Sequence, residues 1–213
     1  MQLSDYYHTY GASGLNIFTP LGATTTAIQT LNWNWDPTRL SLQPLFVGPE
    51  GLTIAQLTFL VTGFAGYVSG GLARLGIYDT APVEDHDVYP RTLVKDFGVT
   101  SVPTGTGFVS TTDGGPSAVL TNGLYWLASV RSIVTAGTYS VMSRGTVQNG
   151  MGPNPLGGID FNLTFASDKL AFGLADMVSS YNVADPLPAY IGLNQVTKKP
   201  DVSGFYFPCL GFT

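Results

Sequence analysis

The sequence predicts an all-β protein, and three of its features point that way. Only 11% of the 213 residues are charged, less than half of the usual share. Helices in water keep an outer face of Lys, Glu and Arg, and this chain has too few such residues to supply those faces. Several stretches instead alternate apolar and polar residues with a period of two, separated by segments rich in Gly, Thr, Ser, Pro and Asn.

The length of 213 residues fits one domain built as a β-sandwich or barrel. We expect an irregular N-terminal arm over residues 1–38 and a β-sandwich body over residues 39–213. The arm mixes aromatic and polar residues without a clear period, among them Tyr6, Tyr7 and Tyr10. Such an arm either lies across the body or a neighbouring subunit, or closes one end of its own sandwich, and the sequence leaves both open.

Two segments are expected to pair at the centre of the body, residues 56–79 and residues 120–130. In the second segment, alternate residues from Leu124 to Val130 fall on one apolar face, while the other face becomes polar toward Arg131. Such a strand packs one side on a core and gradually shows its other side to water.

The strands and turns around this pair follow from local composition. Residues 39–47 predict a strand in which Pro44, lacking an N–H, indicates a sheet edge or a bulge. Residues 48–51, Gly-Pro-Glu-Gly, predict a turn. The Thr and Val content of residues 52–61 favours a strand over a helix, and the glycine-rich residues 63–71 are expected to connect a hairpin.

The second half of the chain holds shorter signals. Further β-prone runs occur at residues 89–94, 106–112, 117–120 and 139–142. The clearest alternation of apolar and polar residues is at 159–165, and only residues 170–178 suggest a short helix. Residues 148–155 form a long polar connection. The last residues, 204–212, are apolar almost to the end, so we expect them to dock in their own sandwich or in a neighbour.

Groups able to carry out catalysis or hold a metal are sparse. The only histidines are His8 and His86, and Cys209 stands in an apolar tail where a thiol stays protonated. The acidic residues 79–87 lack the order of a known calcium loop, which favours a solvated loop over an ion site. No nucleophile elbow is present. We therefore expect no enzyme, and no catalytic, cofactor-binding or metal-binding residues.

Charge and hydropathy exclude two classes of partner. The net charge is −5 and the isoelectric point is near 4.7, and the nine basic residues are scattered, which argues against a nucleic-acid surface. No apolar run is long enough to span a membrane, and no secretory signal is visible at the N-terminus. The low charge suits a protein with much of its surface against other subunits.

Four segments resemble, in their order, a domain of tailed-bacteriophage virion proteins. They are Arg-Leu-Ser-Leu-Gln-Pro-Leu-Phe-Val at 39–47, Ala-Arg-Leu-Gly-Ile-Tyr-Asp at 73–79, Tyr-Pro-Arg-Thr-Leu-Val-Lys-Asp-Phe-Gly at 89–98 and Leu-Thr-Asn-Gly-Leu-Tyr-Trp-Leu-Ala at 120–128. That domain is a jelly-roll-like β-sandwich found at the tips of tail fibres and in some proteins that decorate capsids. The same sandwich serves several virion roles, so the motifs indicate the fold more than the task.

The resemblance implies a virion protein, assembled in the bacterial host cytoplasm as a homotrimer, whose partners are the major capsid protein or other virion proteins. Two tasks compete. Because the chain shows no repeat and no shaft, we favour a capsid decoration (cement) protein that bridges capsomers over a tail-fibre or receptor-binding protein. The Tyr-rich start, residues 148–155 or the Phe-rich end would then make the contacts.

Overall fold

The computed structural model of the protein describes residues 7–10, 15–18, 28–32, 40–65, 71–80, 90–102, 105–111, 114–132, 138–145, 175–177, 181–198, 206–208 and 210–212. These residues form antiparallel β-sheets, and there is no α-helix among them. A 3-10 turn, η4 (Leu193–Gln195), is the helical element that they include. The all-β prediction is therefore confirmed for the described part of the chain.

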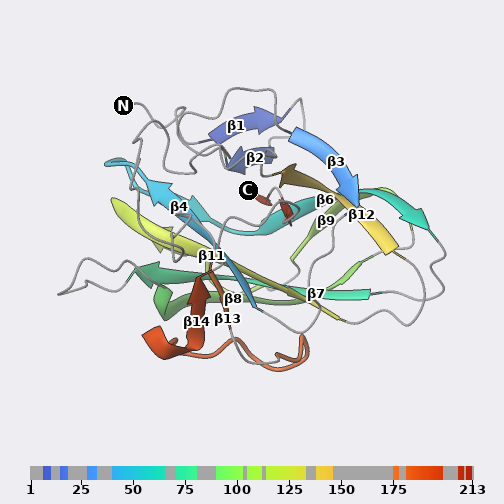
Figure 1. Ribbon diagram of the computed structural model, residues 1–213. Helices are drawn as coiled ribbons and strands as arrows, with labels where there is room; N and C mark the ends of the chain where they lie inside the picture. The colour runs from blue at the N-terminus through green and yellow to red at the C-terminus, as the bar shows by residue number, and fades with distance from the viewer. Residues whose placement is uncertain are drawn as a thin grey trace, which may run out of the picture.

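The larger sheet has eight strands in the order β1-β2-β16-β6-β12-β15, with β3 also pairing with β12 and β9 with β6. Its strands are β1 (Tyr7–Tyr10), β2 (Leu15–Phe18), β3 (Ile28–Asn32), β6 (Leu57–Ala65), β9 (Gly107–Ser110), β12 (Thr138–Gly145), β15 (Tyr206–Pro208) and β16 (Leu210–Phe212). In Figure 1 the strands β1, β2 and β3 lie at the top of the molecule.

The second sheet has six strands in the order β14-β13-β4-β11-β7-β8, and β5 and β10 form a separate two-stranded ribbon. The strands are β4 (Ser41–Val47), β7 (Gly71–Thr80), β8 (Pro90–Val102), β11 (Gly123–Arg131), β13 (Ala175–Met177), β14 (Val196–Lys198), β5 (Leu52–Ile54) and β10 (Ala118–Leu120). The strands β7, β8, β13 and β14 lie in the lower half of Figure 1.

The main core joins the two sheets. Side chains of β7 and β11 such as Leu75 and Leu127 are buried in one cluster with Phe59 of β6 and Val109 of β9. The ribbon contributes Ile54 and two side chains of β10 to the same cluster. Because alternate residues of a strand point to opposite faces, this cluster uses only one face of the six-stranded sheet.

The central pairing expected between residues 56–79 and 120–130 is confirmed for the part in β7, whereas β6 belongs to the other sheet. Strand β7 pairs with β11 so that Ile77 lies opposite Leu127 and Tyr78 opposite Trp126. The turn before β5 is confirmed as well, because Gly51 N donates to Gly48 O at 3.0 Å and Gly51 has a φ of 70°. A glycine adopts this left-handed conformation without the steric cost of a Cβ.

Two local expectations are wrong. The glycine-rich residues 63–71 do not connect a hairpin, because β6 belongs to the eight-stranded sheet and β7 to the six-stranded one. Residues 175–177 form the strand β13 and not part of a short helix, since their backbone pairs with β14 on one side and β4 on the other. In both cases long-range pairing overrides a weak local preference.

Pro44 lies within β4, where its Cα partner is Trp126 of β11. On the other side of β4, β13 pairs only with Ser41 and Leu42. In the described structure, β4 therefore has no ladder partner on that outer side at Pro44, a position that tolerates a residue without an N–H.

The described parts of residues 1–38 are strands, although the sequence predicted an irregular arm there. Strands β1 and β2 form a hairpin, β2 pairs with β16, and β3 pairs with β12. The division between arm and body stays a prediction. Residues 148–155 and 159–165, for which we expected a polar connection and a strand, lie outside the described residues.

Candidate functional site

A segment of irregular backbone covers the six-stranded sheet on the face away from the main core. We call residues 181–191 the clip. It runs below the sheet in Figure 1, as part of the orange segment. Val183, Leu187 and Ile191 are buried and spaced four residues apart, so the clip has three apolar anchors.

The anchors enter a second hydrophobic cluster. Its other buried members come from β7, β11 and the start of β4 and are Leu40, Leu42, Tyr78, Trp126, Ala128 and Val130. The anchor Leu187 lies directly on Gly76, where an added Cβ would overlap Leu187 Cδ1 and come within 3.0 Å of Lys95 O. The glycine therefore provides the space in which the middle of the clip rests on the sheet.

An ion pair between β7 and β8 lies under the clip. Arg74 Nε donates to both oxygens of Asp96 at 3.0 and 2.9 Å, and Arg74 Nη2 lies 2.9 Å from Asp96 Oδ2. The side chains are 11% and 18% exposed, so the pair is shielded from most solvent. This fork geometry is the strong form of an arginine–carboxylate interaction.

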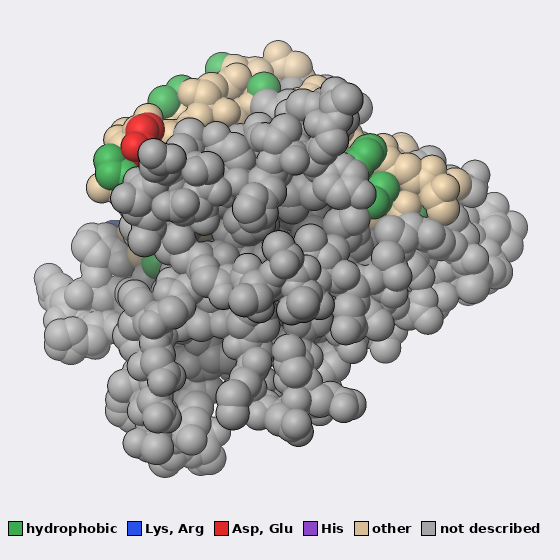
Figure 2. Space-filling view, turned by 90° about the horizontal axis from the view of Figure 1, so that it is seen from above, with side chains coloured by type: hydrophobic (Ala, Val, Ile, Leu, Met, Phe, Trp, Pro, Cys, Tyr) green, Lys and Arg blue, Asp and Glu red, His purple; other side chains and the backbone are tan. Residues whose placement is uncertain are grey.

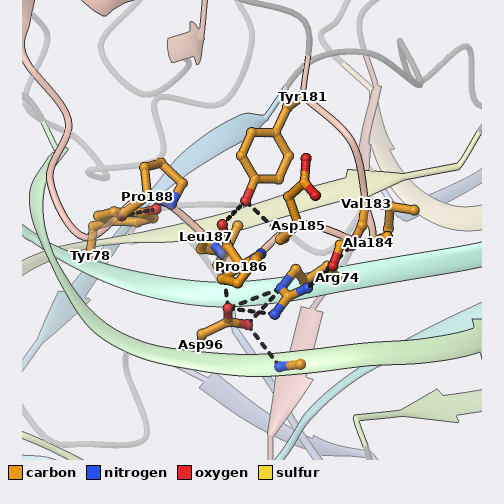
Figure 3. Close-up of polar contacts among 11 residues, drawn as sticks. Arg74, Tyr78, Asp96, Tyr181, Val183, Ala184, Asp185, Pro186, Leu187 and Pro188 are labelled. Atoms are coloured by element: carbon orange, nitrogen blue, oxygen red, sulfur yellow. Dashed lines mark hydrogen bonds and ion pairs between the residues drawn. The ribbon is translucent and has the colours of Figure 1, made fainter.

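The same two side chains hold the clip by its backbone (Figure 3). Arg74 Nη1 donates to the carbonyl oxygens of Val183 and Ala184 at 3.3 and 3.2 Å. Leu187 N donates to Asp96 Oδ2 at 3.0 Å, and Gly98 N donates to Asp96 Oδ1 at 2.8 Å. Each carboxylate oxygen thus accepts at least two hydrogen bonds, which suits a structural anchor and leaves little capacity for proton transfer.

Two tyrosines complete the cluster. Tyr78 Oη donates to Pro188 O at 2.8 Å, and Tyr181 Oη donates to the carbonyl oxygens of Asp185 and Pro186 within the clip. Burial raises the pKa of Tyr78 well above its usual value of 10.0, and it raises the pKa of Tyr181 to about 12. Both phenols are therefore neutral donors at physiological pH.

The far end of the clip adds to the edge of the sheet. Leu93 N donates to Ala189 O at 3.0 Å and Ile191 N donates to Arg91 O at 2.8 Å, which makes a short antiparallel bridge to β8. Beside this bridge, Tyr190 is 51% exposed and the Arg91 guanidinium carbon lies 5.5 Å from the centre of its ring. This is a small exposed corner with an aromatic and a cationic group.

The segments that the sequence predicted as contact regions are only partly described. The structure brings the two chain ends together, because Gly211 and Phe212 of β16 pair with Ile17 and Asn16 of β2. The apolar C-terminus thus docks in the sheet of its own chain, which is one of the two alternatives that the sequence left open. Residues 148–155 lie outside the described residues.

Little of the predicted acidic patch can be placed. Asp79 accepts a hydrogen bond from Thr92 N at 2.6 Å, which ties the end of β7 to β8. Residues 81–89, including His86, and Cys209 lie outside the described residues. Within the described ranges, no group of three or more His, Cys, Asp and Glu residues is placed to hold a metal ion. The same part of the chain forms no helix that is long and apolar enough to cross a membrane.

Sequence reasoning missed the clip and its ion pair. The available signal was Arg74, a charge in the middle of a strand whose neighbouring residues are apolar or small. A charge in such a strand is rarely buried unless it is paired, so a partner was to be expected, but nothing local pointed to Asp96 or to the clip.

The chain matches no protein-family model, no curated protein and no solved structure. Its function must therefore be inferred from its own residues.

Proposed function

We propose that this chain is a structural protein of a tailed-bacteriophage particle, a capsid decoration (cement) protein that binds the shell and bridges capsomers. The class rests on the likeness of residues 39–130 to virion domains. In this proposal the two sheets form a jelly-roll-like antiparallel β-sandwich, and the subunits form a homotrimer. The partners are the major capsid protein or other virion proteins, and the protein acts within the virion.

The placement of the two most distinctive segments of the resemblance carries the proposal. They fall in β7 and β11, which are neighbours in the six-stranded sheet, with Gly76 opposite Ala128 and Ile77 opposite Leu127. One face of these strands packs in the main core and the other lies under the clip. The residues of these two strands are occupied in packing within the chain. In this proposal the contacts with other proteins are therefore made by the sheet edges, the loops and the chain ends.

The chemistry of the described surface agrees with adhesion. From above, the described part of the surface shows mainly hydrophobic or uncharged groups, with an acidic group at its left rim (Figure 2). Surfaces that become interface cores are depleted of charge. The ion pair of Arg74 and Asp96, which is shielded from most solvent, is committed to the clip. We therefore favour adhesion over turnover of a substrate.

Removal of residues 1–12 tests the proposal. Strand β1 pairs only with β2 among the described strands, so the deletion takes away an edge strand and leaves the ladder from β2 to β15 in place. The truncated protein should melt cooperatively but attach more weakly to shells that lack this protein. Full attachment of the truncated protein would show that the N-terminal segment makes no contact with the shell.

The number of copies per particle tests the task itself. A decoration protein covers the shell and is present in hundreds of copies, whereas a fibre protein is present in a few tens or fewer. Quantitative mass spectrometry of purified particles, with the major capsid protein as internal standard, measures this directly. Absence of the chain from purified particles would contradict the virion proposal as a whole.

The exposed corner of Tyr190 and Arg91 favours a second candidate, a receptor-binding tip of a tail fibre. Exposed aromatic side chains with a neighbouring cation are common in binding surfaces. On this alternative, Tyr190→Ala lowers adsorption to host cells and leaves binding to the shell unchanged. On the favoured proposal, the same substitution has no effect on adsorption.

A further inference from the structure

We propose that the clip opens and closes as a unit while the two sheets stay folded, and that its opening uncovers an apolar face of the six-stranded sheet. The proposal concerns the free protein and does not depend on the virion function. It rests on the connections of the clip at its base, on its few links to the sheet and on the surface beneath it.

The base of the clip is closed by hydrogen-bonded strands. The clip lies in the chain between β13 and β14, and these strands pair antiparallel with Met177 opposite Val196. Strand β13 is in turn paired with β4. The segment between the two strands is thus a loop whose ends are fixed side by side, so it can lift off without disturbing its own base.

The sheet does not need the clip for its hydrogen bonds. The order β14-β13-β4-β11-β7-β8 is complete without any clip residue, and the described ladder bonds join these strands to one another. The main core contains none of the clip anchors, since Val183, Leu187 and Ile191 all belong to the second cluster. Opening therefore removes the cover of one face and leaves the other face packed.

Besides its three apolar anchors, the clip is held closed by few polar links, and those at Arg74, Asp96 and Tyr78 are shown in Figure 3. The polar links are the bonds from Arg74 to two carbonyl oxygens, from Leu187 N to Asp96, from Tyr78 to Pro188 O, and the bridge at Ala189 and Ile191. Segments held by few contacts open locally at a lower free energy than the whole protein unfolds. Because Arg74 and Asp96 bind the clip at both Val183 and Leu187, its two halves should open together.

The surface beneath the clip is strongly apolar. It includes Leu42, Tyr78 and Trp126, of which the first two have no exposed surface and the third is 4% exposed when the clip is closed. In the closed state the clip itself covers this surface, and opening exposes it to water.

Native-state hydrogen exchange of the full chain tests the proposal through three amides. Leu187 N and Ile191 N belong to the clip, whereas Leu93 N belongs to β8 but donates to Ala189 O of the clip. All three should exchange at one common opening rate, faster than the amides of Leu127 and Ala128 in β11. The amide of Leu93 is the most informative of the three. It lies in β8, but it is predicted to exchange at the rate of the clip amides and not at the rate of its own strand.

Two matched substitutions sharpen the test. Val183 in the clip and Val109 in the main core are each 4% exposed, so truncation to Ala removes the same atoms from two sites of equal burial. Val183→Ala should speed exchange of the three clip-linked amides by about tenfold. It should speed the β11 amides by the same factor where they exchange through unfolding of the whole protein, because the anchor contacts are lost in both events. Val109→Ala should speed the β11 amides and leave the clip-linked amides unchanged, because the contacts of Val109 persist when only the clip opens.

Acceleration of the clip-linked amides by Val109→Ala to the same extent as the β11 amides would overturn the proposal, because it would show that the clip and the sheet unfold together. Failure of Val183→Ala to fold would overturn it too, since a clip that opens alone cannot be required for the sheets. The proposal would also be overturned if the clip amides of the unmodified protein exchanged at the rate of the β11 amides.

Discussion

The two faces of the six-stranded sheet are closed in different ways. The inner face meets β6, β9 and the β5–β10 ribbon through apolar side chains. The outer face is covered by the clip, which joins the sheet through three apolar anchors and also through the Arg74–Asp96 pair and Tyr78. Strands satisfy their own backbone groups in ladders, whereas irregular backbone over a sheet needs polar side chains as partners. Arg74 and Tyr78, the polar residues in the middle of β7, therefore lie on the clip side.

The largest effect is expected from loss of Asp96. Asp96→Ala leaves Arg74 charged and mostly buried and removes the acceptor for Leu187 N, so we expect a loss of about 3–5 kcal/mol in the free energy of unfolding. Denaturant unfolding followed by circular dichroism measures it. The double variant Arg74→Met with Asp96→Leu removes both charges and should recover much of the loss. A cost below about 1 kcal/mol for Asp96→Ala is the value typical of an exposed pair, and it would contradict the anchoring role of Asp96.

A smaller effect is expected where the clip rests on Gly76. Gly76→Ala forces Leu187 away from the sheet, which should cost about 1–3 kcal/mol of stability. Gly123→Ala is the matched control in β11, because its Cβ would meet only Tyr125 Cε2 at 3.7 Å and should change stability by less than about 0.5 kcal/mol. In a Leu187→Ala background, Gly76→Ala should cost less than it does alone. Equal costs in the two backgrounds would show that Leu187 does not rest on Gly76.

The single hydrogen bond from Tyr78 to the clip should contribute less again. Tyr78→Phe removes the donor to Pro188 O and should cost about 0.5–1.5 kcal/mol. The loss should appear as faster exchange of the clip amides, because the bond to Pro188 O is broken when the clip opens. Unchanged exchange of the clip amides would show that Tyr78 does not hold the clip closed.

A pH-dependent effect is also expected under alkaline conditions. Burial raises the pKa of Tyr181 from 10.0 to about 12, and the pKa of Tyr78 also rises, so folding favours the neutral phenols. Their contribution to stability is complete below pH 10 and is lost as pH rises through the folded-state values. Melting temperatures should be measured at intervals of about one pH unit between pH 9 and pH 12. They should fall less in the Tyr78→Phe/Tyr181→Phe variant than in the unmodified protein. Tyr190→Phe, at an exposed tyrosine, serves as the control. The same fall in all three proteins would contradict the burial of these phenols.

The sequence predicted which residues of β11 share a face, but the face expected to turn toward water is wrong, because Leu127 is 2% and Ser129 is 1% exposed and Leu127 belongs to the main core. The alternation in residues 120–130 placed Leu127 and Trp126 on opposite faces, which the structure confirms through their separate clusters. A period-two pattern reports which residues share a face, and so it finds strands that pack on a core. It also led to the pairing of β7 with β11, whose apolar residues lie opposite each other.

The clip escaped prediction for two physical reasons. Residues 181–191 show no period-two alternation of apolar and polar residues, since they run along the surface of the sheet as irregular backbone. They also contain Pro186 and Pro188. Leu187 and its partner Asp96 are also 91 residues apart in the chain, so no local pattern links them. Strand β8 adds a further difficulty. Its register against β7 shifts in three places, which breaks any simple alternation of its side chains.

The proposal that this chain is a structural virion protein is tested most directly by electron cryomicroscopy of the phage particle to which it is proposed to belong. The account predicts density for this all-β body on the outside of the shell, in contact with several capsomers. Density confined to the tail would replace the decoration role by the fibre role. A particle without this chain would contradict the claim that it is a structural virion protein.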